Sequence, residues 1–177
     1  IIHCGVYFSL FKPRVEECFI QTLQETVVHT EKRGISLLLE NMNRIPQTPA
    51  GKPWDLSLEK PEISYLGITA EELKKIFEKV NSPLLGFSLN VAHANLLRGG
   101  FQPFLEAFGD KLGNVQISDN NGITDEHLPI GEGTVDFTSL VRHLKRMNFQ
   151  GTLSLSIPKA KVLESKDRLQ KILESAA

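Results

Sequence analysis

Apolar residues recur along the chain with two different spacings, and the two kinds of segment alternate. Short runs rich in β-branched residues or leucine predict strands, and longer segments with apolar residues three or four positions apart predict helices. The predicted strands cover residues 1–4, 35–40, 84–90, 114–118 and 152–157. This alternation is typical of β-α units built around a parallel sheet.

Three of the four predicted helices carry continuous apolar stripes. The stripe of the first helix comprises Val15, Phe19, Leu23 and Val27. Gly34 follows where a helix would end, because glycine readily adopts the left-handed backbone of a C-terminal cap. The second helix begins at Thr69, and Glu72 completes a capping box with it. Two further helices are predicted around residues 140–147 and over residues 162–175.

Each predicted strand is apolar on one face and small or polar on the other. The polar face pairs Ser36 with Glu40, Ser88 with Asn90, Gln116 with Ser118, and Ser154 with Ser156. An open sheet covered by helices on both sides would carry apolar residues on both faces. A barrel whose interior opens into a polar pocket explains the alternation better. The long loops 41–67 and 119–136 both follow strand ends, as in (β/α) barrels that build a site there.

The pattern therefore predicts an α/β fold, a partial (β/α) TIM-type barrel forming one domain over residues 1–177. Five β-α units are visible, whereas a complete eightfold barrel needs about 250 residues, so the first two β-α units are expected to be lacking. The chain begins with Ile1 and not with Met, and we expect the natural chain to be longer. Unpaired sheet edges invite pairing, so the alternative is a homo-oligomer or a poorly stable protein.

Composition narrows the choice of partners. The 177 residues are 41% hydrophobic and 23% charged, with a formal net charge of -1. A near-neutral chain without a basic patch makes nucleic acid an unexpected partner. Two cysteines without metal-site spacing point to a reduced, cytoplasmic setting, and the sequence offers no apolar run of the roughly 20 residues that a membrane span needs.

Five segments together resemble the xylose isomerase-like superfamily. They read "IIHCG", "ISLLLEN", "GFSLNVAHANL", "NVQISDNNGITDEHLPIGEGTVDF" and "GTLSLSI", in that order over nearly the whole chain. The superfamily comprises sugar and sugar-phosphate isomerases and epimerases together with endonuclease IV. The resemblance implies a TIM-type barrel that starts at the third strand, and a small sugar or sugar phosphate as the partner.

The resemblance also implies a divalent metal held by a glutamate, an aspartate, a histidine and a second glutamate. The four corresponding positions here are Glu40, Asn90, Gln116 and Ser156. Only Glu40 matches, and it is expected to act as the catalytic base or as a residual metal ligand. Neutral amides and hydroxyls bind a dication weakly, yet they can bond a sugar hydroxyl. We therefore expect Asn90, Gln116 and Ser156 to contact substrate.

The endonuclease IV branch implies a different metal set, matched here by His3, His93, Asp125 and His127. Two histidines and a carboxylate would suit zinc, whereas a carboxylate-rich site would suit manganese. Sugar-converting members also keep such residues to line the pocket without a second metal, so both roles stay open. Glu132 is expected either to cap its loop or to hold His127, and it is also a candidate for contact with substrate.

Two expectations concern the long loops. Asp119 and Asn120 are expected to pin their loop by hydrogen bonds, with Gly131 and Gly133 allowing a tight turn. Trp54 in the proline-rich loop is expected either to form an apolar wall over a sugar or to pack on the barrel rim.

Three functions follow from these residues. The first is a divergent sugar or sugar-phosphate isomerase or epimerase that transfers a proton next to a carbonyl, with a degenerate metal site. The second is a non-catalytic, sugar-binding or regulatory barrel that has lost the metal. The third is a zinc-dependent hydrolase in the manner of endonuclease IV.

Overall fold

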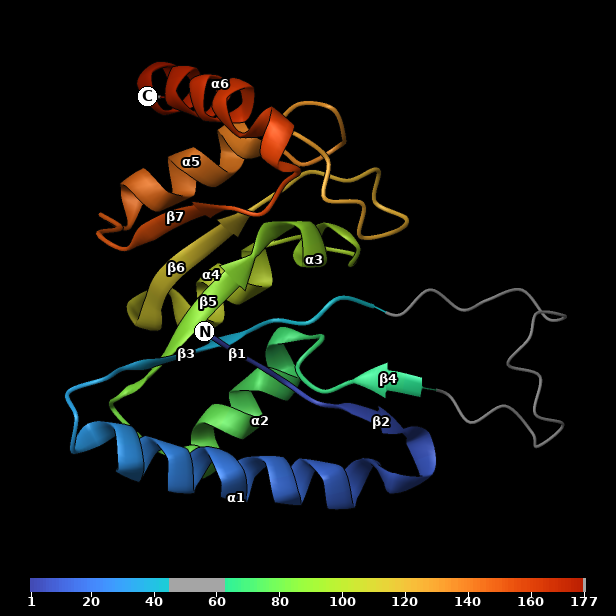
Figure 1. The fold of residues 1–177 in the computed structure, drawn as a ribbon, viewed down its shortest axis with the longest axis vertical. Helices are drawn as coiled ribbons and strands as arrows, with labels where there is room; N and C mark the ends of the chain where they lie inside the picture. Colours follow the sequence, from blue (N-terminus) through green and yellow to red (C-terminus); the bar gives the residue numbers. More distant parts are fainter. Residues whose placement is uncertain (45–62, 177) are drawn as a thin grey trace, which may run out of the picture.

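Five parallel strands form the sheet at the centre of the molecule, as a computed structural model describing residues 1–44 and 63–176 shows (Figure 1). In spatial order they are β1 (Ile2–His3), β3 (Leu37–Glu40), β5 (Leu85–Asn90), β6 (Leu112–Ile117) and β7 (Thr152–Leu155). All five predicted strands are present, with ends that differ by up to two residues, a difference ordinary for strand assignments. The sheet is an arc of a parallel (β/α) barrel whose edges are β1 and β7.

Six α-helices surround this arc in the described part of the chain. They are α1 (Lys12–Glu31), α2 (Ala70–Val80), α3 (Val91–Asn95), α4 (Gln102–Phe108), α5 (Phe137–Arg146) and α6 (Val162–Ser175). Helices α1 and α2 pack together near β1 and β3, and α5 and α6 pack together near β7 (Figure 1). The four predicted helices are confirmed as α1, α2, α5 and α6.

Helix α2 begins at the predicted capping box. The Glu72 backbone N–H donates to Thr69 Oγ1 over 3.2 Å, and Glu72 Oε2 accepts from the Ile68 N–H over 3.2 Å. The return bond therefore reaches one residue before the cap. Both bonds satisfy backbone donors that the first turn of a helix leaves free.

Two strands and two α-helices of the described residues were not predicted from the sequence. Strands β2 (Val6–Phe8) and β4 (Ile63–Tyr65) pair with each other in an antiparallel ribbon. Their pairing joins segments far apart in the chain, and neither strand is long enough to show a period. Helices α3 and α4 span five and seven residues, too few turns for an apolar stripe to stand out.

The core lies between the outer face of the sheet and the helices. It contains the strand residues Leu39, Phe87, Leu89, Val115 and Ile117, each at most 1% exposed. Phe87 also packs on Phe108 of α4, with ring centroids 4.8 Å apart. Burying these side chains supplies the main driving force for folding, and each contributes roughly 1.5–3 kcal/mol.

The inner face of the sheet is polar, as the alternation predicts. Asn114 Nδ2 donates to Ser88 Oγ over 2.9 Å, and Ser154 Oγ donates to Asn114 Oδ1 over 3.1 Å. These bonds link β5, β6 and β7 across the barrel interior. Because Ser88, Asn114 and Ser154 are bonded to one another, these three side chains lie in the interior without a large desolvation cost.

Candidate functional site

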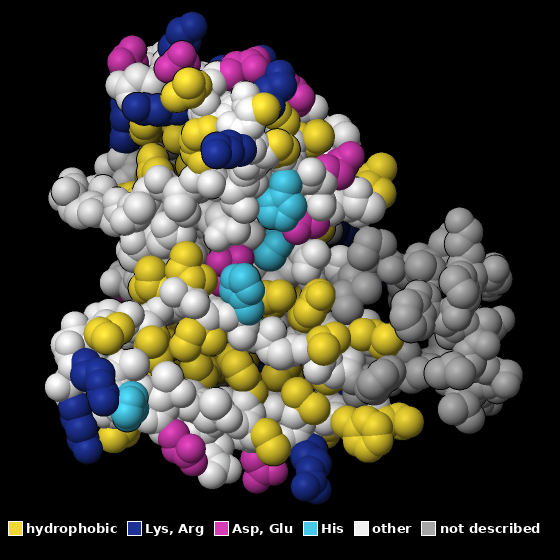
Figure 2. Space-filling view, in the orientation of Figure 1, with side chains coloured by type: hydrophobic (Ala, Val, Ile, Leu, Met, Phe, Trp, Pro, Cys, Tyr) yellow, Lys and Arg dark blue, Asp and Glu magenta, His cyan; other side chains and the backbone are white. Residues whose placement is uncertain are grey.

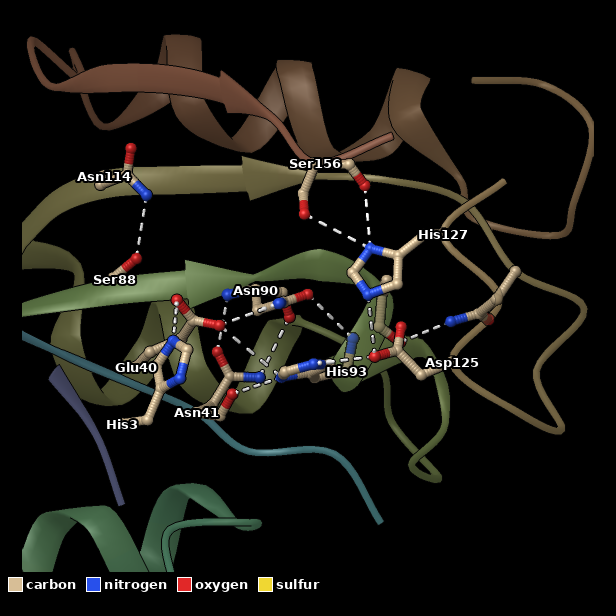
Figure 3. A network of polar contacts seen from close by, with 12 residues as sticks. His3, Glu40, Asn41, Ser88, Asn90, His93, Asn114, Asp125, His127 and Ser156 are labelled. Carbon is tan, nitrogen blue, oxygen red and sulfur yellow. Dashed lines mark hydrogen bonds and ion pairs between the residues drawn. The ribbon is translucent and has the colours of Figure 1, made fainter. Parts of the chain in front are cut away.

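The polar residues meet at the carboxyl ends of β3, β5, β6 and β7 (Figure 3). Histidine and acidic side chains also come together near the centre of the face drawn in Figure 2. Parallel strands deliver their last residues to one edge of the sheet, where (β/α) barrels place their sites. The predicted location of the site is therefore where these side chains converge.

Glu40 is the last residue of β3 and is completely buried. Its Oε1 accepts a 2.9 Å hydrogen bond from Asn90 Nδ2. Its Oε2 lies 3.4 Å from His3 Nε2 but accepts no hydrogen bond from any described residue. A buried carboxylate oxygen without a bonded partner is uncommon and indicates binding capacity left for a ligand.

Asn90 ends β5 and begins helix α3. Its Oδ1 accepts a 3.1 Å bond from the His93 backbone N–H, so it caps the helix. Because the oxygen is used in this way, the amide nitrogen is the atom that faces Glu40. The backbone N–H of Asn90 donates to Asn41 Oδ1 over 2.7 Å, and Asn41 Nδ2 donates to the Asn90 carbonyl over 3.0 Å. The ends of β3 and β5 are thus locked together.

His93 lies on α3 and is 7% exposed. Its Nδ1 is 2.7 Å from the Asn41 carbonyl, and its Nε2 is 3.1 Å from Asp125 Oδ2. Burial lowers the pKa of His93, but the bonds to Asp125 and to the Asn41 carbonyl outweigh burial and leave it raised. Burial likewise raises the pKa of Asp125, but the bond and charge of His93 outweigh burial and leave it lowered. Both shifts therefore favour the charged forms, protonated His93 and ionised Asp125.

His127 approaches the same carboxylate from the loop after β6. Its Nδ1 is 2.8 Å from the Ser156 carbonyl, and its Nε2 is 3.4 Å from Asp125 Oδ2. The backbone of His127 has φ of 53°, a left-handed conformation that a histidine adopts at a cost. Asp125 thus lies between two imidazoles, while its buried Oδ1 has no hydrogen-bond partner among the described residues.

Asp119 organises the loop that carries Asp125 and His127. Its carboxylate accepts hydrogen bonds of 2.9–3.0 Å from the backbone N–H groups of Asn120, Gly131, Gly133 and Val135. A Cβ at residue 133 would lie 2.4 Å from Asp119 Oδ1, so only glycine fits there. Asn120 adds a 2.8 Å bond to the Ala92 carbonyl of α3. The prediction that Asp119 and Asn120 pin the loop is confirmed.

The remaining predicted site residues have different surroundings. Gln116 is in register with Asn90, is partly exposed, and makes no side-chain hydrogen bond to a described residue. Ser156 holds His127 through its carbonyl, with its Oγ 3.3 Å from His127 Nδ1. The carboxylates of Glu40 and Asp125 are therefore each approached by amide or imidazole groups. Trp54 lies outside the described residues.

The expectation that Glu132 holds His127 is wrong. The backbone N–H groups on either side of Glu132 turn inward to Asp119, and the Glu132 side chain is exposed, 3.8 Å from Lys161 Nζ. The Ser156 carbonyl takes the position at His127 Nδ1 instead. A main-chain group carries no signature in the sequence, which is why this partner was missed.

The four positions of the family's metal set do not fit a divalent cation. Glu40 is the single carboxylate among them, and Asn90 directs an amide N–H₂, a donor, toward it. More generally, no group of three or more His, Cys, Asp or Glu side chains within residues 1–44 and 63–176 is placed to hold a metal ion. As they stand, His93 and His127 each contact Asp125 directly.

Asn41 and Asn114 are site residues that were not predicted. Asn41 follows Glu40 directly in the sequence, and this adjacency is the signal that could have identified it. Asn114 could have been found by extending the polar face of its strand back by one pair of residues. Both bond partners on neighbouring strands, so their roles depend on the register of the sheet.

Comparison with known proteins identifies relatives of the same fold. The family described as xylose isomerase-like TIM barrel matches residues 1–177. The uncharacterized protein MJ1311 of Methanocaldococcus jannaschii is 31% identical over 180 residues, covering 98% of this chain and 56% of that protein. An L-ribulose 3-epimerase of Methylomonas sp. is 26% identical over 128 residues, covering 71% of this chain and 43% of the epimerase.

Among solved structures, a D-tagatose 3-epimerase-like protein superimposes with a TM-score of 0.80 and 30% identity, covering 99% of this chain and 61% of that chain. The chain thus spans between 43% and 61% of the length of these relatives. No helix in the described part of the chain is long and apolar enough to cross a bilayer. The strand order, the polar interior and these similarities agree, and the chain belongs to the xylose isomerase-like TIM barrel family.

Proposed function

We propose that this chain forms part of a sugar isomerase- or epimerase-like barrel that binds a small sugar or sugar phosphate and transfers a proton next to its carbonyl. Glu40 is the proposed base. The observation that carries this proposal is the Oε2 of a completely buried carboxylate, which accepts no hydrogen bond from a described residue and is placed where strand ends converge. A carboxylate held by one oxygen can accept a proton with the other.

The groups around Glu40 suit a polyhydroxylated ligand. The Gln116 amide has no protein partner among the described residues and can both donate to and accept from a hydroxyl. His127, with 43% of its side chain exposed, presents an imidazole at the same edge. A ligand with hydroxyl and carbonyl oxygens on consecutive carbons could bond these groups while one carbon lies near Glu40. L-Ribulose and D-tagatose appear in the names of two relatives and are suitable first ligands.

Proton transfer can be measured by solvent exchange. We would incubate the full chain with each ketose in deuterated water and follow loss of the proton next to the carbonyl by NMR. Exchange should occur with the wild-type protein and fall about 100-fold or more in Glu40→Gln, because removing a general base typically costs that much. Glu17→Gln, at an exposed position on α1, is the matched control and should exchange as the wild type does. Equal exchange in wild type and Glu40→Gln would contradict the role of Glu40.

The second candidate is a non-catalytic sugar-binding or regulatory barrel. It is favoured by the neutral Asn90, Gln116 and Ser156, since a two-base epimerisation needs a second proton-transferring group opposite Glu40. For this candidate, calorimetry should detect sugar binding that Gln116→Ala weakens, while the exchange experiment detects no turnover.

The third candidate, a zinc hydrolase, rests on His93, Asp125 and His127. Both histidines bond a backbone carbonyl through Nδ1 and turn Nε2 toward Asp125, as zinc-binding histidines commonly do. The direct contacts of the two histidines with Asp125 would have to open for a zinc or manganese ion to enter. About one equivalent of zinc after dialysis, lost in His127→Ala, together with chelator-sensitive cleavage of abasic DNA, would favour this candidate over the sugar chemistry.

A further inference from the structure

We infer that the Asn90 side chain takes the place of a divalent cation at Glu40: it holds the carboxylate in position, and the Glu40 site operates without a metal. Asn90 is thus a positioning residue, because it acts through Glu40. The inference rests on the proposed function in one respect, which is the proton transfer assigned to Glu40. How Glu40 is held can be tested without any sugar.

The orientation of the Asn90 amide is determined by its bonds. Its Oδ1 accepts from the His93 backbone N–H, and its Nδ2 lies 2.9 Å from Glu40 Oε1. Turning the amide over would remove the cap of α3 and bring two oxygens together. A cation beside Glu40 Oε1 would therefore meet N–H hydrogens where it needs a lone pair.

The groups around Glu40 also offer a dication little negative charge, because imidazoles and neutral side chains surround this single carboxylate. Glu40 Oε2 is 3.4 Å from His3 Nε2, and Glu40 Oε1 is 3.8 Å from His93 Nδ1. The other three positions of the family's set carry amides or a hydroxyl. One carboxylate offers little compensation for the dehydration of a doubly charged ion. Hydrogen bonding by Asn90 stabilises that single negative charge without adding a positive one.

The frame behind Asn90 makes this arrangement rigid. Asn41 bonds both the backbone N–H and the backbone carbonyl of Asn90, and all three of Glu40, Asn41 and Asn90 are fully buried. A metal ion fixes its ligands relative to one another, and here a network of amide hydrogen bonds does so. The network joins the ends of β3 and β5 to the start of α3.

The substitution Asn90→Asp tests this inference because it changes only the group that faces Glu40. One oxygen of the introduced carboxylate could still cap α3, while the other would oppose the Glu40 carboxylate. We expect the melting temperature in EDTA to fall by about 5 °C or more, because two buried carboxylates repel each other. Millimolar MnCl2 should restore most of this loss. The wild-type protein should melt at the same temperature in EDTA and in MnCl2.

Asn114→Asp is the matched control. Asn114 is also a buried asparagine on the inner face, but it bonds Ser88 and Ser154 and no carboxylate. Its substitution should lower the melting temperature without recovery in MnCl2. The double variant Glu40→Gln with Asn90→Asp should likewise show no recovery, because only one carboxylate remains at the site.

Two outcomes would overturn the inference. One is a folded Asn90→Asp variant that MnCl2 does not stabilise more than it stabilises Asn114→Asp. The other is metal bound through Glu40 in the wild type, which can be measured without an Asn90 variant. After dialysis against MnCl2, mass spectrometry should find the same metal content in wild type and Glu40→Gln. An extra equivalent in the wild type would mean that Glu40 binds metal. If the protein passes these tests but exchanges no sugar proton, the inference about Asn90 holds and the proposed function is contradicted.

Discussion

At the scale of single residues, the site is defined by how a few charged groups are satisfied. Glu40 and Asp125 are the two acids at the strand ends, and each is approached by an amide or an imidazole. His93 lies between them, and its bonds to Asp125 and to the Asn41 carbonyl raise its pKa despite burial. The contacts that support the two acids therefore come from neighbouring side chains.

The pH dependence of stability should report the His93–Asp125 pair. The raised pKa of His93 stabilises the folded protein. This stabilisation is complete below the ordinary pKa of 6.5 and is lost as pH rises through the pKa of the folded state. The lowered pKa of Asp125 also stabilises the folded protein. This stabilisation is complete above the ordinary pKa of 3.8 and is lost as pH falls through the pKa of the folded state. Both contributions are thus complete between about pH 4 and 6.5.

We therefore expect the free energy of unfolding to decline above pH 6.5, and Asp125→Asn to flatten this decline because the imidazolium then loses its partner. Urea unfolding between pH 5 and 9 measures the effect. His29→Gln, at an exposed position on α1, should leave the profile as it is. An identical decline in wild type and Asp125→Asn would show that another group is responsible.

At the scale of elements, the loop between β6 and α5 is a preorganised support. One carboxylate, Asp119, collects four backbone N–H groups, and the loop is tied to α3 by Asn120. Such a carboxylate stabilises a single loop conformation, because each charge-assisted bond is stronger than a neutral one. His127 reaches the site because this loop is held in place.

Gly133→Ala should disrupt this loop. The added Cβ would lie 2.3 Å from the Asn120 carbonyl oxygen and 2.4 Å from Asp119 Oδ1, and both atoms belong to the buried network. We expect a loss of about 2 kcal/mol or more in the free energy of unfolding, because backbone must move. Gly5→Ala is the control, since nothing lies within 4 Å of a Cβ there. Equal stability of the two variants, measured by urea unfolding, would contradict the rigid loop.

At the scale of the whole molecule, the open side of the arc near β1 is apolar. Val6, Leu10 and Phe11 are 54%, 81% and 58% exposed. A groove of about 490 Å³ between β2 and α1 is lined partly by Val6, Phe11 and Phe19. Figure 2 shows hydrophobic side chains gathered over the lower half of the view. A large apolar patch commonly marks a surface that another segment or chain covers.

We expect the 177-residue chain on its own to self-associate through this surface. Leu10→Lys combined with Phe11→Lys should shift sedimentation velocity profiles toward the monomer, because burying the added charges would be costly. Leu163→Lys, at a position that is 77% exposed on α6, is the control and should leave association unchanged. A wild-type chain that is monomeric at all concentrations and melts cooperatively would contradict this expectation.

The sequence by itself determined the order and type of the main elements, the polar interior and the location of the site. Periodicity and strand-end residues such as Glu40 are local properties of the chain, and a parallel sheet delivers strand ends to one edge. Tertiary structure alone decided the ribbon of β2 and β4, the exposure of Glu132 and the atom that Asn90 turns toward Glu40. Those features depend on register and on backbone partners such as the Ser156 carbonyl, which leave no mark on residue type.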